Sequence, residues 1–454
     1  MKKTEGHSME NSVISRKELR KDILKLAWPC VVEQTFACLI ATISTTLVSS
    51  IGKEAVNAVS ICNQPMYIPN VIFQAFNVGG TALIARFLGM KDQESAKKTC
   101  AQTLVLSLMM GLIASLFLRF AGGFVIRFLG ASDDYYYLAL EYMNYASIGL
   151  IFQALSTSIA AMLRGAGRTR LSMYFNIAAS ATNVVVGYVM IHVLGLGVRG
   201  AGIAFLIAHI TGCSIALSQL FFRKGMEIHI TPKQIFHFDF KLVGRIANVG
   251  IGTALEQIAL RIGMIFFTTQ IVSLGTEQYA AHNIASNIDN YTCIMAMALS
   301  VSLTPLVGQS LGALELDKAE KYFSEAIKIG LVCSAVLVSI LLIFPRYLAM
   351  IFIRDEAVIY YVERCLRMLA INTTGQLLQM SVCGGLRGGG DTRWPLISTM
   401  IGILGVRTTL VILLIRILGM DVSGAWLAMA IDQTIRACII YLRYKSGKWK
   451  TIKV

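Results

Sequence analysis

The chain has 454 residues, of which 55% are hydrophobic and 15% are charged, and its mean hydropathy is +0.64. A soluble globular protein carries roughly 25% charged residues, so this composition excludes an ordinary soluble protein. The formal net charge is +15, but the basic residues fall in clusters between apolar blocks rather than in one stripe, which argues against nucleic-acid binding. We therefore expect an integral membrane protein with no nucleic-acid partner.

The apolar blocks have the length of membrane-spanning helices, each of which needs about 20 apolar residues. Six blocks lie in each half of the chain, so we expect twelve transmembrane helices. The expected spans are 24–50, 68–89, 96–118, 136–162, 171–193 and 201–222, followed by 246–273, 284–311, 323–344, 358–384, 395–417 and 424–444.

The polar segments around these blocks predict the domain organisation. Residues 1–22 are expected to form a cytoplasmic tail, 23–222 an N-terminal six-helix bundle, 223–245 a cytoplasmic linker, 246–445 a C-terminal six-helix bundle and 446–454 a basic cytoplasmic tail. Basic clusters alternate with basic-poor connections, so the positive-inside rule predicts that both termini are cytoplasmic. The polar N-terminus does not resemble a signal peptide, and the lack of targeting segments suits the plasma (inner) membrane of a prokaryote.

The second half of the sequence repeats the first at an offset of 223 residues (256 − 33). The Glu-Gln pair at 33–34 returns at 256–257, and LRGAGRTR at 163–170 returns as LRGGGDTR at 386–393. Because each copy has an even number of spans, the two copies have the same orientation in the membrane. The predicted fold is therefore an all-α integral membrane protein, with two parallel six-helix repeats around a central cavity.

Several segments also carry a resemblance to a known family. They are WPCVVEQ in the first span, GTALIARFLG and TPLVGQSLG at the ends of the second and eighth spans, AAHNIASNI, the paired LRGxGxTR loops, and GVR in the eleventh span. Over nearly the whole chain after the tail they resemble the multidrug and toxic compound extrusion (MATE) family. This resemblance implies a secondary antiporter that exports organic, often cationic, compounds in exchange for protons or sodium ions. The wider superfamily also contains flippases of lipid-linked saccharides.

Three carboxylates inside the expected spans are candidates for ion coupling. A charge at mid-bilayer costs roughly 2.5–3.5 kcal/mol by insertion scales, so a retained one suggests a function. Glu33 and Glu256 lie near the middle of spans one and seven, and Asp289 lies in span eight. Glu256 with Asp289 is the preferred coupling pair, which resembles in kind the acidic pair of sodium-linked family members. The alternatives are that Glu33 and Glu256 only hydrogen-bond to neighbouring helices, and that Asp289 is solvated at the outer interface.

One position departs from the family pattern. Many MATE proteins carry an acidic residue in a V-D-T motif late in span one, where this chain reads Ile43-Ser44-Thr45. The resemblance therefore leaves the cation site of the N-terminal half in doubt and shifts the expected coupling site to the C-terminal half.

Spans two and eight begin with polar side chains at helical spacing, which lipid would not tolerate. We expect these side chains, and the glutamines that follow Glu33 and Glu256, to line the substrate cavity. The expected cavity residues are Gln34, Gln257, Asn63, Gln64, Asn283, Asn287 and Tyr67.

Arginines fall into two groups. Arg261 and Arg407 lie within spans, where we expect structural ion pairs. Arg164 and Arg387 belong to the repeated LRGxGxTR loops, where we expect them to anchor the cytoplasmic interface. The ten cysteines are scattered without metal-ligand spacing, so no metal site is expected.

Enzyme motifs are not found in the sequence. It contains no Gly-rich phosphate loop ending in Lys-Ser or Lys-Thr, no H-E-x-x-H and no G-x-S-x-G, so neither hydrolysis nor ATP-driven pumping is expected. We predict an H⁺- or Na⁺-coupled antiporter, not an enzyme, that exports organic, cationic drugs by alternating access. It is expected to act as a monomer in lipid, with small-molecule substrates and no cofactor besides the coupling ion. A lipid-linked saccharide flippase and a channel are the alternatives.

Overall fold

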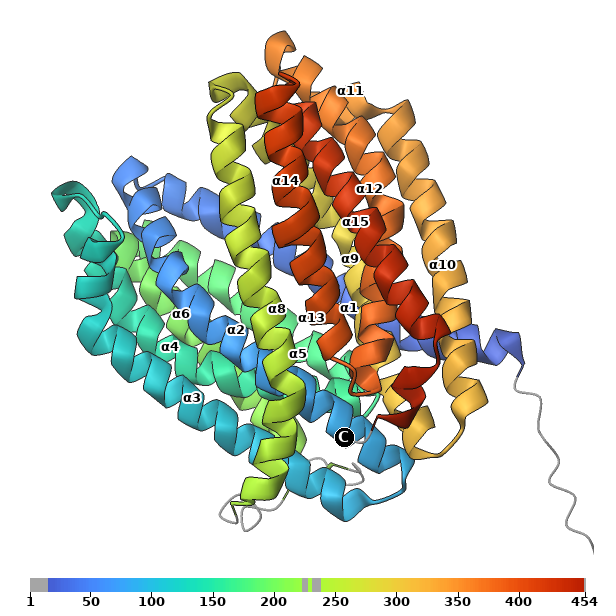
Figure 1. The fold of residues 1–454 in the computed structure, drawn as a ribbon. Helices are drawn as coiled ribbons and strands as arrows, with labels where there is room; N and C mark the ends of the chain where they lie inside the picture. Colours follow the sequence, from blue (N-terminus) through green and yellow to red (C-terminus); the bar gives the residue numbers. More distant parts are fainter. Residues whose placement is uncertain (1–14, 223–227, 231–237, 453–454) are drawn as a thin grey trace, which may run out of the picture.

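The computed structural model describes residues 15–222, 228–230 and 238–452, and this part of the chain is helical without any strand (Figure 1). Eleven helices in it are long and apolar enough to cross a membrane. The remaining expected span, 358–384, lies in α12 (Glu356–Gly388), which is more polar because it includes Glu363, Arg364 and Arg367. Residues 1–14, 223–227, 231–237 and 453–454 of the predicted tails and linker lie outside the described residues.

The N-terminal bundle consists of α1 (Arg16–Ser49), α2 (Lys53–Gly89), α3 (Gln93–Phe128), α4 (Asp133–Gly165), α5 (Thr169–Tyr188) with its π-helical continuation η1 (Val189–Val193), and α6 (Gly197–Phe222). The C-terminal bundle consists of α8 (Phe240–Val272), α9 (Thr276–Gly312), α10 (Leu316–Ile343), the short α11 (Pro345–Met350), α12, the stretch α13 (Arg393–Thr399), η2 (Met400–Arg407), α14 (Thr408–Val411) and η3 (Ile412–Ile417), and then α15 (Val422–Lys445) and η4 (Lys448–Thr451).

Helix ends differ from the expected span limits where capping residues extend a helix into polar sequence. Ser15 and Glu18 form a capping box, so α1 includes residues 16–22 of the expected tail. The side chain of Asp239 caps α8 by accepting hydrogen bonds from the backbone amides of Lys241 and Leu242, so the helix begins within the expected linker. Hydropathy measures the apolar part of a helix, whereas a cap determines where the helix begins.

The backbone confirms the sequence repeat. Lys91 and Leu314, 223 residues apart, have nearly equal positive φ angles of 60° and 61° in the turns after α2 and α9. Thr81 donates a hydrogen bond to the carbonyl of residue 161 at 3.0 Å, and Thr304 donates one to the carbonyl of residue 384 at 2.9 Å. The same interhelical contact therefore occurs at the same place in both bundles.

Each bundle sends the first half of its first helix onto the other bundle. Leu19 and Ile23 of α1 are fully buried in a core cluster with residues of α9, α10 and α12. At matching positions of α8, Leu242 and Ile246 pack into a cluster with residues of α2 and α3. In Figure 1, α1 runs behind the C-terminal bundle and emerges beside α10. The two bundles therefore share their cores at one end of the molecule.

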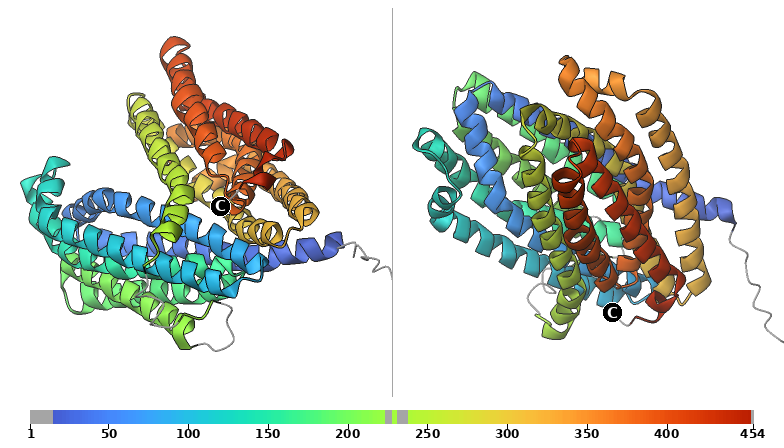
Figure 2. Two further views of the ribbon diagram at one scale, coloured as in Figure 1. Left: turned by 60° about the horizontal axis from the view of Figure 1, so that its bottom comes forward. Right: turned by 45° about the horizontal axis from the view of Figure 1, so that its top comes forward.

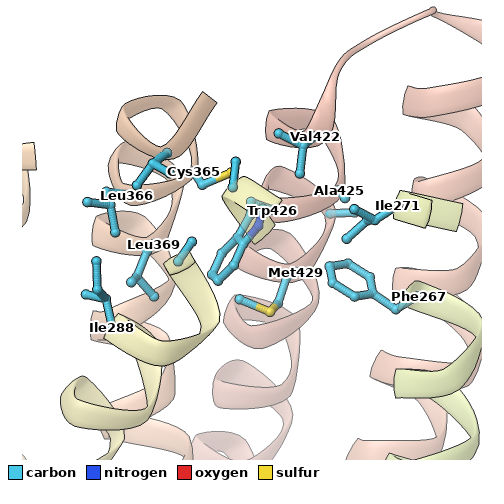
Figure 3. Packing of buried hydrophobic residues seen from close by; sticks show 14 of the residues in the cluster. Phe267, Ile271, Ile288, Cys365, Leu366, Leu369, Val422, Ala425, Trp426 and Met429 are labelled. Atoms are coloured by element: carbon cyan, nitrogen blue, oxygen red, sulfur yellow. The ribbon is translucent and has the colours of Figure 1, made fainter. Parts of the chain in front are cut away.

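The opposite half of the C-terminal bundle has a separate core. Trp426 of α15, Leu369 of α12 and Ile288 of α9 pack together, and Phe267 and Ile271 of α8 close the cluster from the other side (Figure 3). This packing holds α8 to its own bundle beyond the point where it leaves the N-terminal one.

Glycines allow α2 and α9 to meet closely at their last turns. A Cβ atom at Gly312 would overlap the carbonyl oxygen of Arg86, and one at Gly89 would overlap that of Gln309. Gln309 also donates a hydrogen bond across the contact to the carbonyl of Gly165 at 3.1 Å. From this contact the two bundles diverge, as the left view of Figure 2 shows. The structure is therefore closed at the end that holds the LRGxGxTR loops.

The C-terminal segment covers this closed end. Trp449 of η4 is fully buried against Phe323 and Tyr444 of the C-terminal bundle. Beyond it, the carbonyl of Ile452 accepts a hydrogen bond from Arg86 of α2 at 2.8 Å. The last described residues, expected to be only a basic tail, thus join the two bundles.

Gly312→Ala should open the closed end, because the added methyl group collides with the Arg86 backbone. Overpacking costs about 1–3 kcal/mol, enough to shift a two-state equilibrium by roughly fivefold or more. Spin labels at positions 93 and 316, in a background without native cysteines, should report an added longer distance. Gly244→Ala is the control, since a Cβ there meets no atom within 4 Å. An unchanged distance distribution in Gly312→Ala would contradict the conclusion that this contact holds the end closed.

Candidate functional site

Glu33 lies inside the N-terminal bundle on α1, and its carboxylate is paired. Arg164, in the last turn of α4, donates to it from Nη2 at 2.6 Å. Asn176 of α5 donates at 2.8 Å, and the hydroxyl of Ser172 lies at 3.5 Å. The side chain of Glu33 is only 9% exposed, so the arginine and the amide replace the water that this charge would need.

Glu256 repeats this arrangement in the C-terminal bundle. Arg387, in the last turn of α12, donates to its carboxylate at 2.7 Å, and the hydroxyl of Thr399 lies at 3.4 Å. The Glu256 side chain is 4% exposed. Thr399 occupies the position equivalent to Asn176, since 399 − 176 = 223. Both halves therefore pair a carboxylate in their first helix with the arginine of their LRGxGxTR motif.

This result changes the role expected for Arg164 and Arg387. They were expected to anchor the cytoplasmic interface, but their guanidinium groups point to carboxylates on neighbouring helices. The sequence contained a usable signal: the spacing from glutamate to arginine is 131 residues in both repeats. A pair of opposite charges that is duplicated at constant spacing is a candidate contact.

Asp289, the third candidate, lies half-buried on α9 and is not part of any ion pair among the described residues. Its Oδ1 accepts a hydrogen bond from Thr292 at 3.1 Å and lies 3.9 Å from the sulfur of Cys293. Gln376 of α12 donates to that sulfur at 2.8 Å. The contacts of Asp289 and those of Glu256 share no residue, so the structure does not join them as one site.

The expected cavity residues form an exposed polar face on two central helices. Asn63 and Gln64 of α2 are exposed, as are Asn283 and Asn287 of α9. Gln34 and Gln257 are half-buried beside the paired glutamates. The central cavity itself stays a prediction.

Tyr67 connects this polar face to the opposite bundle. The guanidinium carbon of Arg261, on α8, lies 4.7 Å from the centre of the Tyr67 ring on α2. Such a contact is a cation–π interaction, so Arg261 has an aromatic partner in place of the expected ion pair. The contact also shows that Tyr67 faces α8.

A second charged network lies deep in the C-terminal bundle. Arg407 of η2 donates to Asp432 of α15 at 2.7 Å, and Arg436 lies 3.2 Å from the other oxygen of the same carboxylate. Asp432 is completely buried and both arginines are nearly so. The expected ion pair of Arg407 is confirmed, and the carboxylate is shared by two arginines.

At the place where many family members carry an acid, Ser44 instead donates a hydrogen bond to the side-chain oxygen of Asn183 at 3.0 Å. The described residues contain no group of three His, Cys, Asp or Glu side chains that could hold a metal ion.

Two parallel repeats of membrane-crossing helices, with paired charges inside and a contact at one end, define a multi-pass membrane transporter. A family model described as MatE matches residues 29–189 and 253–413, which is more than half of the chain. The chain therefore belongs to the MatE family, the multidrug and toxic compound extrusion transporters. This is a family of transporters rather than of enzymes.

Individual relatives match this chain over almost its full length. The probable multidrug resistance protein NorM of Thermotoga maritima is 25% identical, over 95% of this chain and 94% of that protein. The uncharacterized transporter YisQ of Bacillus subtilis is 24% identical, over 97% and 99%. Among solved structures, an outward-facing multidrug resistance MATE transporter has a TM-score of 0.89 at 22% identity, covering 95% of this chain and 97% of that one. A transporter of the same superfamily from Pyrococcus furiosus has a TM-score of 0.88 at 22% identity, over 94% and 95%.

Removal of one partner of the Glu256–Arg387 pair should destabilise the protein by about 3–5 kcal/mol, because a buried charge is left unpaired. Glu256→Gln and Arg387→Met should each lower the melting temperature in detergent. The double variant should lose less stability than the sum of the losses in the two single variants, since it leaves no unpaired charge. Strictly additive losses would mean that the two side chains do not interact. Glu33→Gln with Arg164→Met provides the same cycle in the other bundle.

Proposed function

We propose that this protein is an ion-coupled antiporter that exports organic cations by alternating access, driven by H⁺ or Na⁺. The observation that carries the proposal is Asp289 on α9, a half-buried carboxylate that has no ion pair among the described residues. A carboxylate that is not neutralised by an arginine can bind a proton, a sodium ion or a cationic substrate in turn.

Exposed amide side chains on the two central helices support a cationic substrate. Asn283 and Asn287 lie six and two residues before Asp289 on α9 and are exposed, and Asn63 and Gln64 provide similar groups on α2. Amides solvate a cation with their carbonyl oxygens and adapt to ligands of different shape. The ring of Tyr67 adds a surface that attracts cations.

Glu33 and Glu256 contribute to the proposed coupling in a different way. Each holds an arginine at the end of the fourth helix of its repeat. A proton or sodium ion on the carboxylate would weaken this pair and free the arginine, so the LRGxGxTR loop would change its packing. Ion binding would then bias the neighbouring contact between α2 and α9.

Alternating access in this proposal uses the contact between α2 and α9 as one gate. Its glycines permit close packing of the two backbones in one state, and a tightly packed helix contact of this kind can act as a two-state joint. We place this end, the linker and both termini on the cytoplasmic side of a prokaryotic plasma membrane, in line with the basic residues there. The proposed transporter works as a monomer without a cofactor.

Asp289→Asn should abolish coupled export while the fold is kept, since asparagine retains the volume but neither the charge nor the proton. Ethidium efflux from energised cells that lack their own pumps, at equal membrane expression, should fall to the background of cells without the protein. Asp134→Asn, at the exposed start of α4, is the matched control and should leave efflux unchanged.

Two other outcomes would decide against parts of this proposal. Efflux that survives Asp289→Asn would remove Asp289 from the coupling mechanism. No efflux by the intact protein, across several cationic dyes, would contradict cation export and favour the flippase of lipid-linked saccharides. In proteoliposomes, transport driven by an imposed pH gradient or by a sodium gradient identifies the coupling ion.

A further inference from the structure

A charged hollow of about 310 Å³ lies on the exposed side of the N-terminal bundle, outside the proposed transport site. It lies against α4, with one arginine from α3 and another from α6. The lining residues are Arg119, Glu141, Asn144, Tyr145, Ile148 and Arg199.

The two arginines are held in place by neutral groups. Arg119 donates to the side-chain oxygen of Asn144 at 2.5 Å, and Arg199 donates to the Tyr145 hydroxyl at 2.9 Å. Among the described residues neither arginine forms an ion pair, although Glu141 lines the same hollow. Each guanidinium group has five N–H donors, so most of them remain available to a ligand.

The matching place in the C-terminal bundle is different. The position equivalent to Glu141 is Arg364 (141 + 223), which pairs with Asp421 at 2.6 Å. The position equivalent to Arg119 is Leu342 (119 + 223). The duplicated fold therefore does not require this cluster, and the C-terminal bundle neutralises its charge there within the protein.

The surroundings of Arg119 are apolar and exposed. Arg119 lies on a membrane-crossing helix directly after the expected span 96–118, and an exposed charge without an ion pair is costly near the apolar part of a membrane. Leu116 and Leu112 lie one and two turns before it on the same face of α3, and they are 55% and 41% exposed. They lead from the hollow towards the middle of the helix. A ligand with a charged head and apolar chains would match both surfaces.

We propose that this hollow binds the headgroup of an amine-bearing phospholipid of the phosphatidylethanolamine type. The guanidinium groups of Arg119 and Arg199 bind its phosphate in the fork geometry that suits phosphate oxygens. The Glu141 carboxylate accepts hydrogen bonds from its ammonium group, which a quaternary choline headgroup cannot donate. The acyl chains lie along Leu116 and Leu112, so a lipid rests beside α3 and α4.

The test compares lipids bound to the purified full chain by native mass spectrometry after exchange into defined mixtures. The intact protein should retain phosphatidylethanolamine in preference to phosphatidylcholine. Arg119→Met and Arg199→Met should each weaken retention about tenfold, because each removes charge-assisted hydrogen bonds. Glu141→Gln should keep phospholipid binding but lose the preference for ethanolamine over choline.

Arg127→Met is the matched control, because Arg127 lies on α3, pairs with Asp133 and does not line the hollow. It should retain lipid like the intact protein. If Arg119→Met fails to fold, Arg119→Lys keeps the charge without the fork and should still bind more weakly.

Three results would overturn the proposal. The first is equal retention of ethanolamine and choline lipids by the intact protein. The second is unchanged retention in both arginine variants. The third is binding of glycerophosphoethanolamine or inorganic phosphate to the intact protein as strong as the binding of the lipid. That result would mean that the ligand is a soluble phosphate compound.

Discussion

An ionised carboxylate in the interior of a membrane protein needs a cationic partner, and this requirement governs how each half of the chain is assembled. Glu33 and Glu256 lie on the first helix of their repeats, and Arg164 and Arg387 lie at the end of the fourth. Each pair joins two helices that are far apart in sequence, 131 residues in both cases. Because an unpaired charge there would be costly, each pair ties these two helices to one another. The hydrogen bonds from Asn176 and Thr399 extend the same junction to the fifth helix.

The same first helices also join the two bundles. Leu19 and Ile23 of α1 are buried in the C-terminal bundle, and Leu242 and Ile246 of α8 are buried in the N-terminal one. A change in the charge pair on either helix therefore acts on a helix that touches both halves. The contact between α2 and α9 lies at the same end, where a glycine on each side leaves no room for a side chain. The charge pairs, the packing of α1 and α8 on both bundles and the proposed gate are therefore physically connected.

The duplicated scaffold carries different chemistry in its two halves. The C-terminal bundle contains the half-buried Asp289 and the buried Arg407–Asp432 pair. The N-terminal bundle has a neutral contact between Ser44 and Asn183, and its outer hollow holds Arg119 and Arg199. The two halves keep the same backbone and packing because each half must fold as a six-helix bundle. Substrate, ion and lipid contacts are free to diverge, because each is needed only once.

By itself the sequence determined the membrane class, the spans, the duplication and the family resemblance, because these depend on local composition and on self-similarity. It also identified Glu33, Glu256 and Asp289 as carboxylates within the membrane-spanning helices, since charges within apolar blocks are visible along the chain. Only the tertiary structure showed their partners: Arg164 for Glu33 and Arg387 for Glu256, with no residue shared between the contacts of Glu256 and Asp289 in the described part of the chain. Partners depend on which helices pack together and how each is rotated, and neither hydropathy nor spacing within one helix contains that information. For the same reason the hollow between α3, α4 and α6 could not be predicted, because its residues come together only through packing.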